Sequence, residues 1–228
     1  MQSAPVKQKE TPKAEFLLPV RFQNNKRVTA YLLSRGIDMA ILDYCFQHGL
    51  LYEAADYHNA VFVGYDGKTP RYATLRGTLS GNGFKRDVTG SSKQFCFSIT
   101  GRGNGKLNVF ECAIDALSYL TQVKMQGADW RQESVLSLGG VYKSTPNEVP
   151  KVPVALQGYL NAHADVCEIV LRLDNDAVGR GAASAISRAI TNLPVSVELP
   201  ADGKDYNEWL MRQKGISPRP RARNEPER

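Results

Sequence analysis

A buried strand that ends in two aspartates is the feature of this chain that most constrains its fold. Residues 169–173 hold four apolar side chains, and such a run is typical of a strand inside a parallel sheet. Asp174 and Asp176 follow the run directly, and side chains two residues apart in an extended backbone point to the same side. Since open α/β sheets bind ligands at the carboxyl ends of their strands, the pair is a candidate functional site.

The two aspartates admit two interpretations. Two neighbouring anions repel each other unless a cation lies between them, and Mg²⁺ is the hard divalent ion that carboxylate oxygens suit best. Alternatively, Asp176 is only the N-cap of the next helix. That helix is predicted over residues 182–190, after Gly179 and Gly181 loosen the turn.

Composition favours an anionic partner. The chain has 228 residues, a net charge of +6 and a sequence pI of about 9.1, which points first to nucleic acid. The four cysteines are scattered without a Cys-x-x-Cys pair, so we expect no zinc site, reduced thiols and a cytoplasmic protein. No apolar run approaches the roughly 18 residues of a membrane span, and no membrane partner is expected.

The chain divides into two patterns at the glycine-rich segment 101–105. Before it, helices are predicted over 27–35 and 38–48, and a hairpin over 60–65 and 71–76. After it, strands and helices alternate, with strands over 107–110, 135–138, 169–173 and 195–199, and helices over 112–124, 154–164, 182–190 and 206–213. The expected fold class is therefore α/β, a parallel sheet flanked by helices and preceded by a small α+β subdomain.

Four segments follow from this division. They are a flexible lead-in over residues 1–20, the α+β subdomain over 21–100, the α/β domain over 106–214, and a basic, disordered tail over 215–228. Basic and aromatic residues alternate in the second of them, at Tyr72, Arg76, Phe84, Lys85, Arg86, Lys93 and Phe95. Such a mixture suits single-stranded nucleic acid, with charges for phosphates and rings for bases, although a solvated sheet face is the plain alternative.

Acidic residues follow three of the predicted strands. Glu111 ends the first, with Asp115 four residues later, Asp174 and Asp176 end the third, and Asp205 follows the fourth. Because the carboxyl ends of parallel strands share one sheet edge, these side chains are expected to converge. Converging carboxylates can hold one or two Mg²⁺ ions, which stabilise the attacking and leaving oxygens of a phosphoryl transfer.

The segments that carry these acids resemble the Toprim domain of bacterial DnaG-type primases. The similar segments, in matching order and spacing, are Asn-Val-Phe-Glu-Cys-Ala-Ile-Asp-Ala-Leu at 108–117, Ser-Leu-Gly-Gly at 137–140, Leu-Asp-Asn-Asp-Ala-Val-Gly-Arg-Gly-Ala-Ala at 173–183 and Pro-Ala-Asp-Gly-Lys-Asp-Tyr-Asn-Glu-Trp-Leu at 200–210. Upstream, residues 57–62, 71–77 and 84–91 resemble a shortened primase subdomain that carries template. This part is most similar to the domain that precedes Toprim in uncharacterised proteins of plasmids and conjugative elements.

The resemblance implies roles for individual residues. Glu111, Asp174 and Asp176 would be catalytic and would hold Mg²⁺ or Mn²⁺, with Asp115 and Asp205 in support. The residues implied in nucleic-acid contact are Arg76, Lys85, Arg86, Lys93 and Lys204. The implied partners are single-stranded DNA and nucleotides, with a helicase or a separate zinc-module protein as further candidates.

Two departures from the primase pattern bear on function. Asn207 stands where primases usually have a further aspartate, which weakens the expectation of a second metal. The zinc-binding and helicase-binding modules of such primases have no counterpart in these residues. The leading hypothesis is a Mg²⁺-dependent, primase-like nucleotidyltransferase for replication or transfer of a mobile element. The alternatives are a Toprim nuclease or nickase, and a non-catalytic DNA-binding accessory protein.

Overall fold

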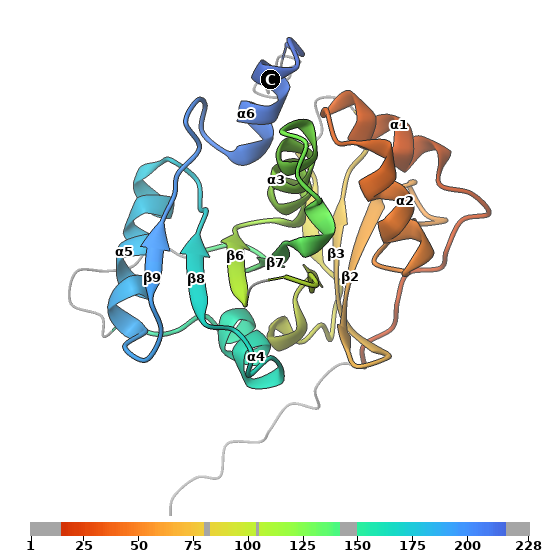
Figure 1. Ribbon diagram of the computed structural model, residues 1–228. Helices are drawn as coiled ribbons and strands as arrows, with labels where there is room; N and C mark the ends of the chain where they lie inside the picture. The colour runs from red at the N-terminus through yellow and green to blue at the C-terminus, as the bar shows by residue number, and fades with distance from the viewer. Residues whose placement is uncertain (1–14, 80–82, 104, 142–149, 218–228) are drawn as a thin grey trace, which may run out of the picture.

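Two sheets lie side by side, with helices on their outer faces (Figure 1). The structure is a computed structural model and describes residues 15–79, 83–103, 105–141 and 150–217. Most of the lead-in predicted over 1–20, and of the tail predicted over 215–228, lies outside these ranges. Among the described residues, no helix is long and apolar enough to span a membrane.

The first sheet is antiparallel and has the strand order β1-β2-β3-β4. Its elements are β1 (Leu51–Glu53), β2 (Ala60–Asp66), β3 (Thr69–Arg76) and β4 (Lys85–Asp87), preceded by α1 (Lys26–Ser34) and α2 (Met39–Gln47). The predicted hairpin is confirmed, and its turn contains Gly67 at a φ of 56°, a left-handed conformation that glycine adopts without strain. The two predicted helices are confirmed as well, with Asp38 capping α2.

The second sheet has the order β5-β7-β6-β8-β9 and is parallel except at one edge. Its strands are β5 (Ser98–Ile99), β6 (Lys106–Phe110), β7 (Ser134–Ser137), β8 (Glu168–Leu171) and β9 (Val195–Val197). The four predicted strands are all present, and β5 is an addition that lies antiparallel to β7. The sheet is therefore mixed and mostly parallel, and the predicted α/β class is confirmed.

Helices cover both faces of the second sheet. They are α3 (Ala113–Met125), α4 (Val154–Ala162), α5 (Ala177–Ala189) and α6 (Tyr206–Gln213), and the short 3₁₀ segments η1 (Lys93–Phe95) and η2 (Trp130–Gln132) connect elements. The prediction for α5 was wrong at its start, because Gly179 lies inside the helix and not in a loose turn. A methyl group at Gly179 would lie 2.1 Å from the carbonyl oxygen of Asp174, so the helix begins directly against the end of β8.

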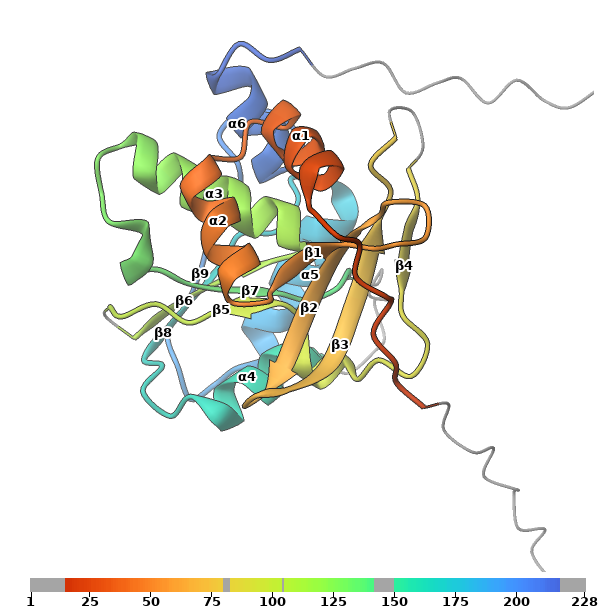
Figure 2. The ribbon, with the colours of Figure 1, turned by 90° about the vertical axis from the view of Figure 1, so that its right-hand side faces the viewer.

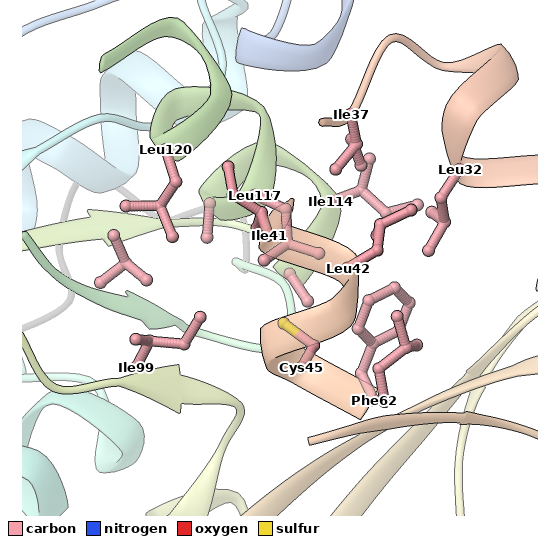
Figure 3. Packing of buried hydrophobic residues seen from close by; sticks show 14 of the residues in the cluster. Leu32, Ile37, Ile41, Leu42, Cys45, Phe62, Ile99, Ile114, Leu117 and Leu120 are labelled. Carbon is pink, nitrogen blue, oxygen red and sulfur yellow. The ribbon is translucent and has the colours of Figure 1, made fainter. Parts of the chain in front are cut away.

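One hydrophobic core joins the N-terminal part of the chain, before residues 101–105, to the part that follows them. Leu32 and Leu42 of the first two helices pack in the same cluster as Leu117 of α3 and Leu210 of α6. Figure 3 shows Leu42 and Phe62 of the N-terminal part facing the α3 side chains. Viewed from the side in Figure 2, α1 and α2 pack beside α3 over the sheets. A second cluster fills the opposite side of β6 to β8, under α4 and α5.

Candidate active site

Glu111 lies at the end of β6, where a backbone hydrogen bond fixes the neighbouring turn. The N–H of Gly140 donates to the carbonyl oxygen of Glu111 at 2.9 Å, and Gly139 and Gly140 both have positive φ. The Glu111 carboxylate accepts a long hydrogen bond of 3.4 Å from the backbone N–H of Asp174. Burial and the charge of Asp174 raise the pKa of Glu111 to about 7, so this carboxyl is poised to exchange a proton near neutral pH.

Asp174 and Asp176 lie at the end of β8 but have different surroundings. Asp176 is the N-cap of α5, where its Oδ1 accepts the N–H groups of Val178 and Gly179 at 2.9 Å each. These hydrogen bonds and Lys204 lower the pKa of Asp176, whereas burial and the charge of Asp205 raise that of Asp174. The helix-cap interpretation of Asp176 is thus confirmed for one carboxylate oxygen, and the other oxygen faces the site.

Lys204 bridges the two aspartates. Its Nζ lies 3.2 Å from Oδ2 of Asp174 and 3.1 Å from Oδ2 of Asp176. The backbone holds it there, because the carbonyl oxygen of Lys204 accepts a 2.6 Å hydrogen bond from the N–H of Asn175. The residue therefore places a cation between the two carboxylates. Lys204 follows the fourth predicted strand, and the sequence therefore indicated that it lies at the same sheet edge as the two aspartates.

Asp115 and Asp205 complete the acidic edge from the side of α3 and α6. Asp115 is buried and accepts hydrogen bonds from the N–H of Asn207 at 3.2 Å and from the Cys112 thiol at 2.8 Å. Burial and the charge of Asp205 raise its pKa well above the usual range. Asp205 itself caps α6, through a 2.7 Å hydrogen bond from the N–H of Glu208. The charge of Asp205 thus acts on both Asp115 and Asp174.

Asn207 serves the packing of the domain. It is 1% exposed, and its Nδ2 donates to the carbonyl oxygen of Arg35 at 3.0 Å and to Oγ of Ser118 at 2.9 Å. These contacts join α6 to α3 and to the link between α1 and α2. The amide at this position ties the N-terminal helices to the second sheet.

The basic residues predicted for nucleic-acid contact differ in exposure and in the contacts that they make. Lys85 and Arg86 are exposed on β4, and the Lys85 Nζ would lie 3.8 Å from a methyl group at Gly140. Arg76 pairs with Lys85 across β3 and β4, and lies in the electrostatic field of Asp115. Lys85 and Arg76 therefore border the acidic edge, whereas Arg86 pairs with Leu75 and alternates to the other face of β4.

Lys93 and Lys204 are held by other contacts. Lys93 donates a 3.2 Å hydrogen bond to the carbonyl oxygen of Gly139 and lies 3.5 Å from Asp87, so it braces the turn beside Glu111. Tyr72, expected among the surface rings, is 1% exposed and donates a hydrogen bond to Asp87, so it offers no ring to a base. That expectation was wrong because β3 packs this face against the second core.

The donor set of the acidic edge fits a hard divalent ion. Among the described residues, no group of three or more His, Cys, Asp or Glu side chains is arranged to hold a metal. However, Glu111, Asp174 and Asp176 supply only carboxylate oxygens, the donors that Mg²⁺ prefers. Lys204 already stands in for a cation between two of them, and burial together with the charge of Asp174 raises the pKa of Glu111.

Comparison with known protein families identifies the second part of the chain. Residues 108–210, from β6 to α6, match the family model described as Toprim-like. This part of the chain is a Toprim-like domain. The resemblance to Toprim domains expected from the acidic motifs is thereby confirmed. Residues 30–103 match a model described as a protein of unknown function (DUF3991), which covers the part that precedes the Toprim-like domain. No curated protein sequence matches the chain.

Three of the similar solved structures are of primases. The primase fragment of the bacteriophage T7 primase-helicase protein is 16% identical, with a TM-score of 0.53 over 81% of this chain and 69% of that one. The Aquifex aeolicus primase, with its zinc-binding and RNA polymerase domains, is 14% identical, with a TM-score of 0.49 over 85% of this chain and 54% of that one. The Escherichia coli primase catalytic core is 12% identical, with a TM-score of 0.48 over 82% and 69% of the respective chains.

Proposed function

We propose that the chain is a Mg²⁺-dependent, primase-like nucleotidyltransferase that acts on single-stranded DNA. The observation that carries the proposal is that β4 lies against the acidic edge. Lys85 lies beside Gly140, and the N–H of Gly140 donates to the carbonyl oxygen of Glu111. A phosphate backbone bound along β4 would thus pass next to the carboxylates, as a template must in a polymerising site.

The residues divide the chemistry between them. Glu111, Asp174 and Asp176 would hold the metal ion, which neutralises phosphate charge and stabilises the attacking and leaving oxygens. Glu111, with a pKa of about 7, can take up a proton at its carboxylate near neutral pH. Arg76, with Lys85 of the edge strand, would bind template phosphates and fix the register of the strand. Residues 57–62, 71–77 and 84–91 resemble a domain found in proteins of plasmids and conjugative elements. This resemblance supports a role in replication or transfer of a mobile element.

A denaturing gel distinguishes primer synthesis from strand cleavage. The protein is incubated with a 5′-labelled single-stranded template, labelled nucleotides and Mg²⁺, and products are resolved under denaturing conditions. Template-dependent oligonucleotides that disappear in Asp174→Asn/Asp176→Asn support the proposal. Shortened template without new strands indicates a nuclease. Unchanged template, with and without an added zinc-module protein, contradicts the proposal, and a shift of the same template on a separate native gel indicates the DNA-binding accessory.

A further inference from the structure

The loop between β1 and β2 presents an aromatic ring to solvent on a strained backbone. Tyr57 is 85% exposed, and Tyr57 and His58 have φ values of 57° and 53°. Residues other than glycine rarely adopt this left-handed region, and two in succession are rarer still. Strain of this kind persists only where surrounding contacts enforce it, and it is concentrated at functional sites.

Side-chain contacts fix the loop at the residue after Tyr57, and the N–H of Ala54 closes the loop by donating to the carbonyl oxygen of Asn59 at 2.9 Å. Nδ1 of His58 lies 2.7 Å from Oε1 of Glu53, and the ring of Phe22 meets the His58 ring edge-on at 4.6 Å. The Thr78 hydroxyl donates to the carbonyl oxygen of His58 at 3.0 Å. Glu53 is 1% exposed, and its other oxygen accepts the N–H of Arg27 at 2.9 Å. Within the described residues, no hydrogen bond or ring contact holds the Tyr57 side chain, which therefore points into solvent.

The loop lies at the basic end of the first sheet. Ala60, at the start of β2, pairs with Arg76, and Arg76 pairs with Lys85. Figure 2 shows the loop at the same end of the sheet as β4. Leu79, next to the Thr78 that holds His58, is 59% exposed and adds apolar surface. A flat ring near the exposed Lys85 and the half-buried Arg76 matches a ligand that has both aromatic faces and phosphates.

We propose that Tyr57 is a stacking platform for a base of single-stranded DNA. This inference rests on the proposed function, since it extends the strand path along β4 to the β1–β2 loop. Arg76 and Lys85 bind phosphates, and the Tyr57 ring stacks on one base regardless of its identity, because every base has a π-face. The His58 contacts fix the backbone that carries the ring before the strand arrives, so little backbone ordering accompanies binding.

Substitution by glycine separates binding from folding. Glycine adopts a φ near 57° without strain, so Tyr57→Gly removes the ring while the loop keeps its conformation, which thermal melting confirms. Fluorescence anisotropy with a labelled oligothymidylate should show about tenfold weaker binding. The slope of log affinity against log salt should stay unchanged, because no phosphate contact is lost. Tyr57→Trp should retain the affinity.

A matched control and an altered ligand make the test specific. Val154→Ala removes apolar surface from a 62%-exposed residue on α4 and should leave binding unchanged. The wild type should bind an oligonucleotide with abasic sites more weakly than the intact oligonucleotide. Tyr57→Gly should bind the two oligonucleotides with nearly equal affinity. If Tyr57→Gly binds intact DNA as tightly as the wild type, the stacking proposal is overturned and the strand path on β4 stands. If the wild type binds no single-stranded DNA, the proposed function fails as well.

Discussion

At the scale of single residues, Lys204 is the side chain whose position says most about the site. It spans Asp174 and Asp176 where a metal ion would be bound, so ammonium and metal compete for the same two oxygens. Its contacts also offset the repulsion between the aspartates when no metal is present. We therefore expect Lys204 to leave this position when the ion binds.

This competition predicts that removing the charge of Lys204 increases the affinity for metal. Lys204→Met should bind Mn²⁺ about three to ten times more tightly in calorimetry, since partly exposed ion pairs are each worth up to about 1 kcal/mol. The same variant should melt at a lower temperature than the wild type without metal. Lys204→Arg keeps the charge and serves as the control. Unchanged metal affinity in Lys204→Met would show that the lysine does not occupy the metal position.

The aspartate pair itself provides the complementary prediction. Asp174→Asn/Asp176→Asn should abolish measurable Mg²⁺ or Mn²⁺ binding, because neutral amides replace both anionic ligands. Asn at position 176 still caps α5, so the fold should persist, with far-UV circular dichroism as the check. Equal metal affinity in the wild type and the double variant would place the metal elsewhere.

At the scale of secondary-structure elements, Asp38 joins the start of α2 to the end of α3. Its Oδ1 accepts the N–H of Ala40 at 2.8 Å and lies 2.6 Å from the Lys124 Nζ. Burial opposes ionisation, but these two hydrogen bonds outweigh it and lower the pKa of Asp38 below the usual 3.8. A carboxyl with a lowered folded-state pKa stabilises the fold above its unfolded pKa, and this contribution is lost as the pH falls through the folded value.

Two substitutions separate the cap from the ion pair. Asp38→Ala should lower the free energy of unfolding by about 1 kcal/mol at pH 7, because the helix loses its N-cap. Asp38→Asn keeps a capping oxygen and should lose only a few tenths of a kcal/mol, the value of a partly exposed ion pair. Denaturant titrations at pH 7 and pH 3 should show that the deficit of Asp38→Asn shrinks on acidification. A deficit that grows at pH 3 would contradict this assignment.

The edge strand β4 predicts how DNA binding depends on salt. Lys85→Ala and Arg86→Ala should each reduce the magnitude of the slope of log affinity against log salt by about 0.7, the value for one phosphate contact with a single strand. Arg188→Ala removes an exposed charge from α5 and should leave the slope unchanged. If the double variant Lys85→Ala/Arg86→Ala keeps the wild-type slope, the strand path does not follow β4.

At the scale of the whole molecule, the shared core couples the two sheets. Leu42 is fully buried in the cluster that also contains Phe110 and Leu117 of the Toprim-like domain. Leu42→Ala should therefore lower the free energy of unfolding by about 2–5 kcal/mol. Far-UV circular dichroism and the fluorescence of the two tryptophans, Trp130 and Trp209, should report one common transition. Separate transitions would instead support the division into independent units at residues 101–105.

Sequence patterns predicted most of this architecture, and the failures arise from tertiary contacts. The alternation of strands and helices after residue 105 and the acids at the strand ends depend on short-range periodicity, which sequence shows directly. The start of α5 was missed because the close approach of Gly179 to Asp174 is a tertiary contact. The bridge made by Lys204, the burial of Tyr72 and the exposure of Tyr57 also depend on packing between distant segments. No periodicity in the sequence encodes them.

Primer synthesis by the Glu111→Gln variant tests most directly whether the acidic edge catalyses nucleotidyl transfer on bound single-stranded DNA. The substitution is nearly isosteric, and melting confirms the fold. Loss of a positioned acid-base group or metal ligand should reduce template-dependent synthesis by about 10²–10⁴-fold. Single-stranded DNA affinity should stay the same or rise, because a negative charge facing phosphate is removed. Wild-type yields of primer from Glu111→Gln would contradict the account.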